Sequence, residues 1–186
     1  MKFVFPNRAK KIEDKFYEFS FDDKEPQPED YKLLDSASSM HYLADIYNWD
    51  DGEEVLDWII SNPKCDKGTA LMIFWRAEPD YYTKYQDETD AGHDAEEFRF
   101  VKKIIDNFKA GFYKRERIHY DPIADGHDVD YIDTNAKWEI PDFMKTSTKG
   151  GNVYYIPDPI DLIQRWWVDY KRKQHRKKRK KRLSKN

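Results

Sequence analysis

Apolar side chains recur at helical spacing in several segments of this 186-residue chain, and this periodicity constrains the fold more than any other feature. The strongest segment is residues 94–109, with Gly111 just past its end. One side of that helix carries Phe98, Val101, Ile104, Ile105 and Phe108. Because short helices are unstable alone, such a stripe must be buried against other elements. The pattern predicts a mainly helical fold.

Three shorter helices are predicted ahead of that segment. The first covers residues 31–47, the second begins after Asp50 or Asp51 as its cap and stops at Pro63, and the third begins after Asp66 as its cap. Their expected buried sides are Leu33, Ala37, Met40, Ala44 and Tyr47, then Val55, Trp58 and Ile59, and finally Ala70, Leu71, Phe74 and Trp75. Near the N-terminus, Ile12, Phe16 and Phe19 are spaced like one face of a further short helix.

After Gly111 the pattern changes. Residues 112–120 alternate like a strand, residues 153–156 form a second, shorter candidate, and residues 121–151 between them are rich in turn formers. A final helix is expected after Asp158, with Ile163, Trp166, Trp167 and Tyr170 on one side. We therefore expect a mainly α (α+β) fold, a compact multi-helix domain with a small peripheral β element and a basic C-terminal tail.

These boundaries divide the chain into four parts. Residues 1–30 form an N-terminal extension and acidic linker, and residues 31–110 form the helical domain. Residues 111–170 form a mixed β and irregular wrap with the final helix, and residues 171–186 form the basic tail.

Charge is distributed very unevenly between the body and the tail. The first 170 residues hold 36 Asp and Glu against 22 Lys and Arg, a net charge of −14, while the last 16 hold 11 Lys and Arg and no acid. Such basic arms bind nucleic-acid phosphates with little sequence preference. The residues expected to do so are Lys171, Arg172, Lys173, Arg176, Lys177, Lys178, Arg179, Lys180, Lys181 and Arg182. The alternative is internal: the tail folds over the acidic body.

No catalytic signature stands out, so an enzyme is the disfavoured class and no cofactor is expected. The Asp-rich loop of residues 121–133 departs from the EF-hand pattern, because Ile123 and Ile132 occupy ligand positions, and we interpret it as a solvated loop without metal. Cys65 is more typical of packing than of catalysis and suits a reducing compartment. Neither a signal peptide nor a membrane-spanning stretch is evident, which favours a cytoplasmic location.

The most distinctive residues are the turn Tyr47, Asn48, Trp49, Asp50, Asp51 and Gly52 and the later run Cys65-Asp66-Lys67-Gly68-Thr69-Ala70-Leu71-Met72-Ile73-Phe74. Helix capping accounts for the three aspartates without any chemistry. A docking role is the alternative, in which Asp50, Asp51 and Asp66 cluster beside the two aromatic rings.

The order and spacing of these two motifs resemble a bacterial domain-of-unknown-function family, number 4274, with its N-W-D-D-G turn and C-D-x-G-T-A-L-x-I-F run. The resemblance covers residues 39–82. It implies a small, soluble bacterial protein from a family without an established activity, some members of which are expected near secreted-toxin genes as candidate immunity proteins.

Two functional hypotheses follow. In the first, the acidic body is a non-catalytic interaction module, such as an antitoxin-like or immunity protein that covers a basic toxin. In the second, the protein associates with RNA or DNA through its basic tail. The family resemblance lies in the body, which favours the first.

Overall fold

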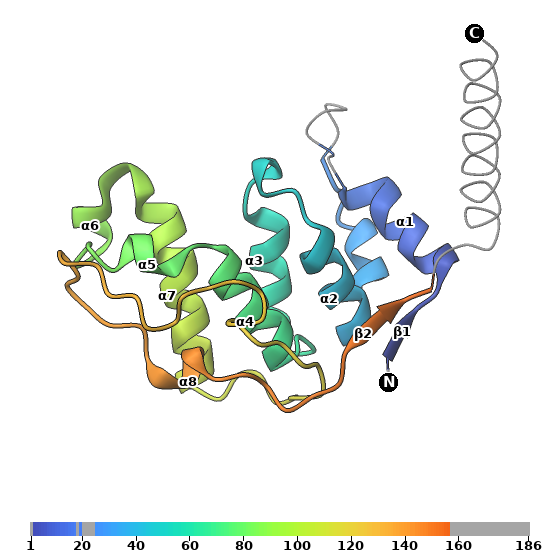
Figure 1. Cartoon of the computed structure of the whole chain (residues 1–186). Coiled ribbons are helices and arrows are strands. Elements are labelled where there is room, and N and C mark those ends of the chain that lie inside the picture. Colours follow the sequence, from blue (N-terminus) through green and yellow to red (C-terminus); the bar gives the residue numbers. More distant parts are fainter. Residues whose placement is uncertain (1, 18, 20–24, 157–186) are drawn as a thin grey trace, which may run out of the picture.

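The computed structural model describes residues 2–17, 19 and 25–156 and confirms a mainly helical fold with a small β element. Helices α1 (Pro6–Phe16), α2 (Ala37–Ile46), α3 (Glu54–Ile60), α4 (Lys67–Arg76) and α7 (Ala95–Lys109) form its body. Figure 1 shows these helices side by side, with α5 (Pro79–Tyr82) and α6 (Glu88–Ala91) beyond α7. The N-terminal helix α1 belongs to this body, because it packs against α2 and buries Ile12 and Phe16.

Helix α4 is the centre of the core. Every residue from Gly68 to Trp75 is buried, since α2 and α7 both pack against this helix and cover different sides of it. The predicted apolar side of the helix, which includes Phe74 and Trp75, is confirmed. Trp75 also donates a hydrogen bond from Nε1 to the Met144 carbonyl at 2.7 Å, which fastens the later irregular segment to the core.

Several details of the predicted helices are wrong, among them the full burial expected of Leu33 and Ala37, which are only partly buried. The single helix expected over residues 31–47 is split into the short 3₁₀ helix η2 (Asp30–Leu34) and α2. The split occurs because Ser36 caps α2, accepting the Ser39 N–H on Oγ at 3.2 Å. Trp58, expected in the core, is only half-buried and packs on Tyr31 at a centroid distance of 4.9 Å.

The strongest predicted helix is confirmed as α7, with Phe98, Val101, Ile104 and Ile105 buried. Gly111 follows with φ of 62° and donates its N–H to the Phe108 carbonyl, which ends the helix in the left-handed region that glycine favours. Ahead of α7, the chain turns a corner at Glu78-Pro79, where Glu78 has φ of 51°.

The β element differs from the prediction. The second candidate strand is confirmed as β2 (Val153–Tyr155), but it pairs in parallel with β1 (Lys2–Val4), with Lys2 opposite Val153. Residues 112–120 form no strand: they make only isolated bridges, Asp66 with Arg115 and Ile118 with Gly151. The alternation correctly indicates an extended backbone, but this segment lies against a helix start and a turn instead of a partner strand.

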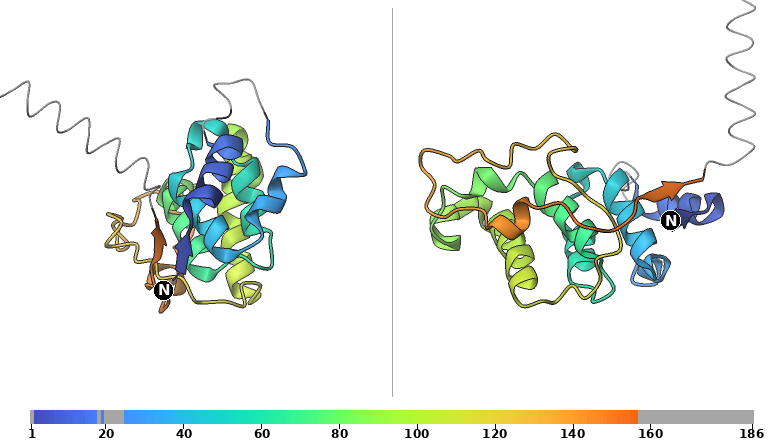
Figure 2. Two further views of the ribbon diagram at one scale, coloured as in Figure 1. Left: turned by 90° about the vertical axis from the view of Figure 1, so that its right-hand side faces the viewer. Right: turned by 60° about the horizontal axis from the view of Figure 1, so that its bottom comes forward.

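Residues 112–152 run along the helices from the end of α7 back to β2, as the lower edge of Figure 1 and the right view of Figure 2 show. The irregular wrapping predicted for residues 121–151 is confirmed, apart from the one-turn helix α8 (Asp142–Lys145). Two glycines let this segment approach closely. A Cβ on Gly68 would lie 2.2 Å from the Ile118 carbonyl oxygen, and a Cβ on Gly150 would lie 2.2 Å from the Ile118 nitrogen.

Within the described residues, no helix has the length and apolar character required to cross a lipid bilayer. The predicted final helix after Asp158 and the basic tail lie outside the described residues.

Candidate functional site

The Tyr47–Gly52 turn is closed by its own side chains. Asn48 accepts the Asp50 N–H on Oδ1 at 3.2 Å and so begins the 3₁₀ helix η3 (Trp49–Asp51). Tyr47 donates its hydroxyl to the Gly52 carbonyl at 3.0 Å, and Gly52 has φ of 80°. The prediction that Asp50 or Asp51 caps the next helix is wrong, because the N-cap of α3 is Glu53, which makes no side-chain cap hydrogen bond.

Asp66 caps α4 as predicted, and it does more than the sequence indicated. Its Oδ1 accepts the N–H groups of Gly68 at 3.1 Å and Ile118 at 3.0 Å, while its Oδ2 accepts the Arg117 N–H at 2.9 Å. The residue is fully buried. This carboxylate therefore joins the start of α4 to the extended segment that crosses it.

The three motif aspartates do not form the docking cluster that was the alternative interpretation. Asp50 and Asp51 precede α3, whereas Asp66 follows it and is inaccessible from the surface. Residues of the Tyr47–Gly52 turn instead line two surface hollows, together with residues from other segments.

The first hollow, which we call the acidic groove, has a volume of about 570 Å³ and lies between the start of α3 and the first turns of α7. Its carboxylates come from both helices. It is lined by Asp51, Gly52, Glu53, Glu54, Asp57, Glu96, Arg99, Phe100 and Lys103.

Both cations of the acidic groove are already paired. Lys103 Nζ lies 2.6 Å from Asp57 Oδ1, and Arg99 Nη2 lies 2.9 Å from Glu88 Oε2. Glu53, Glu54 and Glu96 have no ion pair within the described part of the chain. The groove therefore carries more negative charge than its two cations compensate.

The pKa of Glu53 reflects the crowding of carboxylates in the groove. Burial, together with the nearby charges of Glu97, Asp57 and Glu96, raises its pKa to about 7. A cation brought into the groove would relieve this repulsion, since it favours the ionised carboxylate.

The second hollow, which we call the aromatic hollow, shares Glu53 with the acidic groove and has a volume of about 460 Å³. It lies between the η3 turn, the end of α4 and α5. It is lined by Trp49, Glu53, Arg76, Ala77, Glu78, Tyr81 and Tyr82. Trp49 is the one residue of the predicted docking set that lines it.

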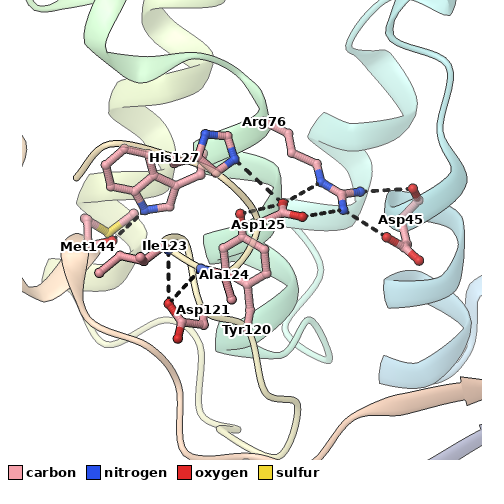
Figure 3. A network of polar contacts seen from close by, with 10 residues as sticks. Asp45, Arg76, Tyr120, Asp121, Ile123, Ala124, Asp125, His127 and Met144 are labelled. Atoms are coloured by element: carbon pink, nitrogen blue, oxygen red, sulfur yellow. Dashed lines mark hydrogen bonds and ion pairs between the residues drawn. The ribbon is translucent and has the colours of Figure 1, made fainter. Parts of the chain in front are cut away.

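Arg76 is one of the residues that line the aromatic hollow. Two aspartates from different segments hold its side chain in place, as Figure 3 shows. Its Nε donates to Asp125 Oδ2 at 3.0 Å, and its Nη1 donates to the Asp45 carbonyl at 2.9 Å. Its Nη2 lies 3.0 Å from Asp45 Oδ1. Tyr120 also donates its hydroxyl to Asp125, at 2.9 Å. The charge of Arg76 is thus balanced by two carboxylates.

The Asp-rich loop of residues 121–133 uses its carboxylates for its own turns. Asp121 Oδ1 accepts the Ile123 N–H at 3.0 Å, Asp128 Oδ1 accepts the Asp130 N–H at 3.2 Å, and Asp125 is held by Arg76. Among the described residues, no group of three or more His, Cys, Asp or Glu side chains is placed to hold a metal ion.

Cys65 is fully buried and reduced, in keeping with the packing role predicted for it. Burial, reinforced by the charge of Asp66, raises the pKa of its thiol far above the ordinary value. The ten tail cations predicted to bind nucleic acid, Lys171 to Arg182, lie outside the described residues.

Sequence reasoning missed Glu53, Glu96, Tyr81 and Tyr82 as site residues. A signal existed in the adjacent acidic pairs Glu53-Glu54 and Glu96-Glu97, each of which lies at a helix start, where the helix dipole alone accounts for acidic residues. The sequence could not reveal that these two helix starts face each other across one groove.

Fold and site together define a small helical domain whose surface hollows surround a Trp-Asp-Asp-Gly turn. Residues 35–109 of the chain match the family described as Domain of unknown function (DUF4274). The match confirms the resemblance carried by the two motifs and extends over α2 to α7. Neither the curated proteins nor the solved structures contain a match to the chain.

Proposed function

We propose that this protein is a non-catalytic interaction module of the bacterial cytoplasm whose acidic body covers a basic protein partner, in the manner of an antitoxin or immunity protein. The observation that carries the proposal is the acidic groove, where Glu53, Glu54 and Glu96 lack any ion pair within the described residues. A positively charged partner surface fits such a groove, because complementary charge accelerates association and rejects acidic competitors.

The test is capture of a partner from the native bacterium by the full-length protein. The informative variant carries Glu53→Gln, Glu54→Gln and Glu96→Gln. Its matched control carries Glu25→Gln, Glu29→Gln and Glu139→Gln, three exposed positions away from the groove, so that the same number of carboxylates is removed. We expect the groove variant to release a basic partner at least about tenfold more easily, and the control to retain it. Equal retention by both variants would refute the proposal.

A second candidate function rests on the tail, whose eleven Lys and Arg are accompanied by no acid. Under this proposal, a chain ending at Tyr170 loses nonspecific RNA and DNA binding, and the full chain shows an affinity that falls steeply with salt. Unchanged affinity and salt dependence after truncation would exclude the tail as the contact surface. Circular dichroism of both chains shows whether the helical body is retained.

A further inference from the structure

The aromatic hollow combines two features that favour a cation. Trp49, Tyr81 and Tyr82 supply ring surface, and the faces of aromatic rings attract positive charge. Glu53 and Glu78 supply carboxylates at the same hollow. A long side chain with an apolar stem and a cationic end matches this combination of lining groups.

Among the described residues that line the hollow, none adds an uncompensated positive charge that would oppose such a ligand. Arg76 is the cation that lines the hollow, and it is balanced by Asp45 and Asp125. Glu97 adds further negative charge, because its Oε2 is buried and has no hydrogen-bond partner among the described residues. The charge of Glu97 acts on both Glu53 and Tyr82, so this carboxylate lies close to two residues that line the hollow.

The chain already pairs its own cations with aromatic rings around this site. Lys84 Nζ lies 3.4 Å from the ring centroid of Tyr81, and Lys102 Nζ lies 4.2 Å from that of Trp138. Neither lysine lines the aromatic hollow. The surroundings of Tyr81 therefore accept an ammonium group, while the hollow itself presents further ring surface.

We propose that the aromatic hollow receives a single lysine or arginine side chain of the basic partner, with its stem against Trp49 and Tyr81 and its cationic end at Glu53. This inference rests on the proposed function and assigns the aromatic hollow as the site that anchors the basic partner. Arginine is among the residues that most often dominate the binding energy of an interface, where they fill well-packed pockets near its centre.

The test uses small probes, so it requires no identified partner. Acetyl-arginine amide, acetyl-lysine amide and the uncharged acetyl-norleucine amide are titrated into the full-length protein, and the indole N–H resonance of Trp49 is followed by NMR. We expect both cationic probes to shift this resonance and to bind at least about fivefold more tightly than the norleucine probe. Equal binding of all three probes would overturn the inference.

Two pairs of variants localise the binding. Glu53→Gln is compared with Glu139→Gln, and Tyr81→Ala with Tyr131→Ala, whose exposed side chains are 46% and 52% accessible. The first member of each pair should weaken the cationic probes by about two- to fivefold, and the second should leave them unchanged. Glu53→Gln removes a crowded charge, so loss of folding does not explain weaker binding by this variant. Unchanged binding by both hollow variants would contradict the inference.

The pH dependence gives an independent readout. The groups around Glu53 are Asp57 on its own helix, Tyr47 just after α2, Glu96 and Glu97 on α7, Glu78 and Tyr82 at α5, and Arg76 on α4. Since Glu53 is half ionised near pH 7, binding of the arginine probe should strengthen from pH 6 to pH 8, and this dependence should disappear in Glu53→Gln. A pH dependence retained in that variant would assign the effect to another group and overturn the role of Glu53.

The two proposals fail in different ways. If the groove variant releases a basic partner but no probe reaches Trp49, the proposed function stands and the anchoring site is wrong. If the cationic probes bind the hollow but no basic partner is captured, the hollow remains a cation site without the interaction that it was proposed to serve.

Discussion

The carboxylates of Asp66 and Glu53, at opposite ends of α3, have opposite surroundings. Asp66, after α3, is fully buried and accepts three backbone N–H groups. Glu53, before α3, is half-buried, makes no cap hydrogen bond and is surrounded by other acids. Burial alone therefore does not decide what an acidic residue contributes. The number of donors that face it separates a structural carboxylate from one that is available to a ligand.

The largest effect that can test this comparison is expected at Asp66. Asp66→Ala would leave the N–H groups of Gly68, Arg117 and Ile118 without their acceptor, so we expect a loss of about 3–5 kcal/mol in the free energy of unfolding. Asp66→Asn retains one acceptor oxygen and should lose less. Urea denaturation measures both. A loss below about 1 kcal/mol for the alanine variant would show that water replaces the carboxylate.

Gly68→Ala is the next most disruptive change at this end. The added Cβ would lie 2.2 Å from the backbone oxygen of Ile118, so either α4 or the crossing segment must move. We expect about 2–3 kcal/mol of destabilisation, in the upper range for overpacking. Gly126→Ala is a useful contrast, because it has open space around its Cβ and only a strained φ of 98°. Thermal unfolding should rank Gly68→Ala as the more damaging substitution.

Near Asp66, His41 makes the free energy of unfolding sensitive to acid. Its Nδ1 lies 3.2 Å from Thr69 Oγ1 in the first turn of α4, and burial lowers its pKa to about 4. As pH falls from about 6.5 to 4, the unfolded chain takes up a proton that folded His41 does not, so stability decreases. We expect His41→Gln to remove about 2 kcal/mol of this acid-dependent loss. Parallel stability profiles for the two proteins over this pH range would refute the assignment.

Substitution of Glu53 should give the smallest change in stability, and this change should be a gain instead of a loss. Its folded pKa of about 7 lies above the ordinary value of 4.5, so ionised Glu53 destabilises the fold above pH 7, and this penalty disappears as pH falls toward 4.5. After allowance for solvent screening at a half-exposed site, Glu53→Gln should stabilise the protein by roughly 1 kcal/mol at pH 8. The gain should be absent at pH 4. A destabilised variant at pH 8 would mean that Glu53 has a favourable partner.

What the sequence revealed depended on the range of each interaction. The helix at residues 95–109 and the cap at Asp66 rest on contacts within a few residues, and both were predicted correctly. The strand expected over residues 112–120 was wrong, because alternation indicates an extended backbone but not which segment pairs with it. The hydrogen bonds from Arg117 and Ile118 to Asp66 could not be predicted from the sequence for the same reason.

The candidate site was less predictable than the fold for the same reason. Of the predicted docking residues, Trp49 and Asp51 line the hollows, while Asp66 is structural. Glu53 and Glu96 become neighbours only after α3 and α7 have packed into one body. No local sequence pattern predicts this contact.

The parallel pairing of Lys2 with Val153 imposes a waiting time during protein synthesis. At about 5–20 residues per second, a ribosome needs roughly 8–30 s to make the 151 residues that separate the two partners. Throughout that interval the nascent chain presents Phe3 and Phe5 beside a backbone edge that has no strand to pair with. The strand β1 is therefore made well before the strand that pairs with it, and a chaperone that recognises short aromatic segments has a long opportunity to bind there.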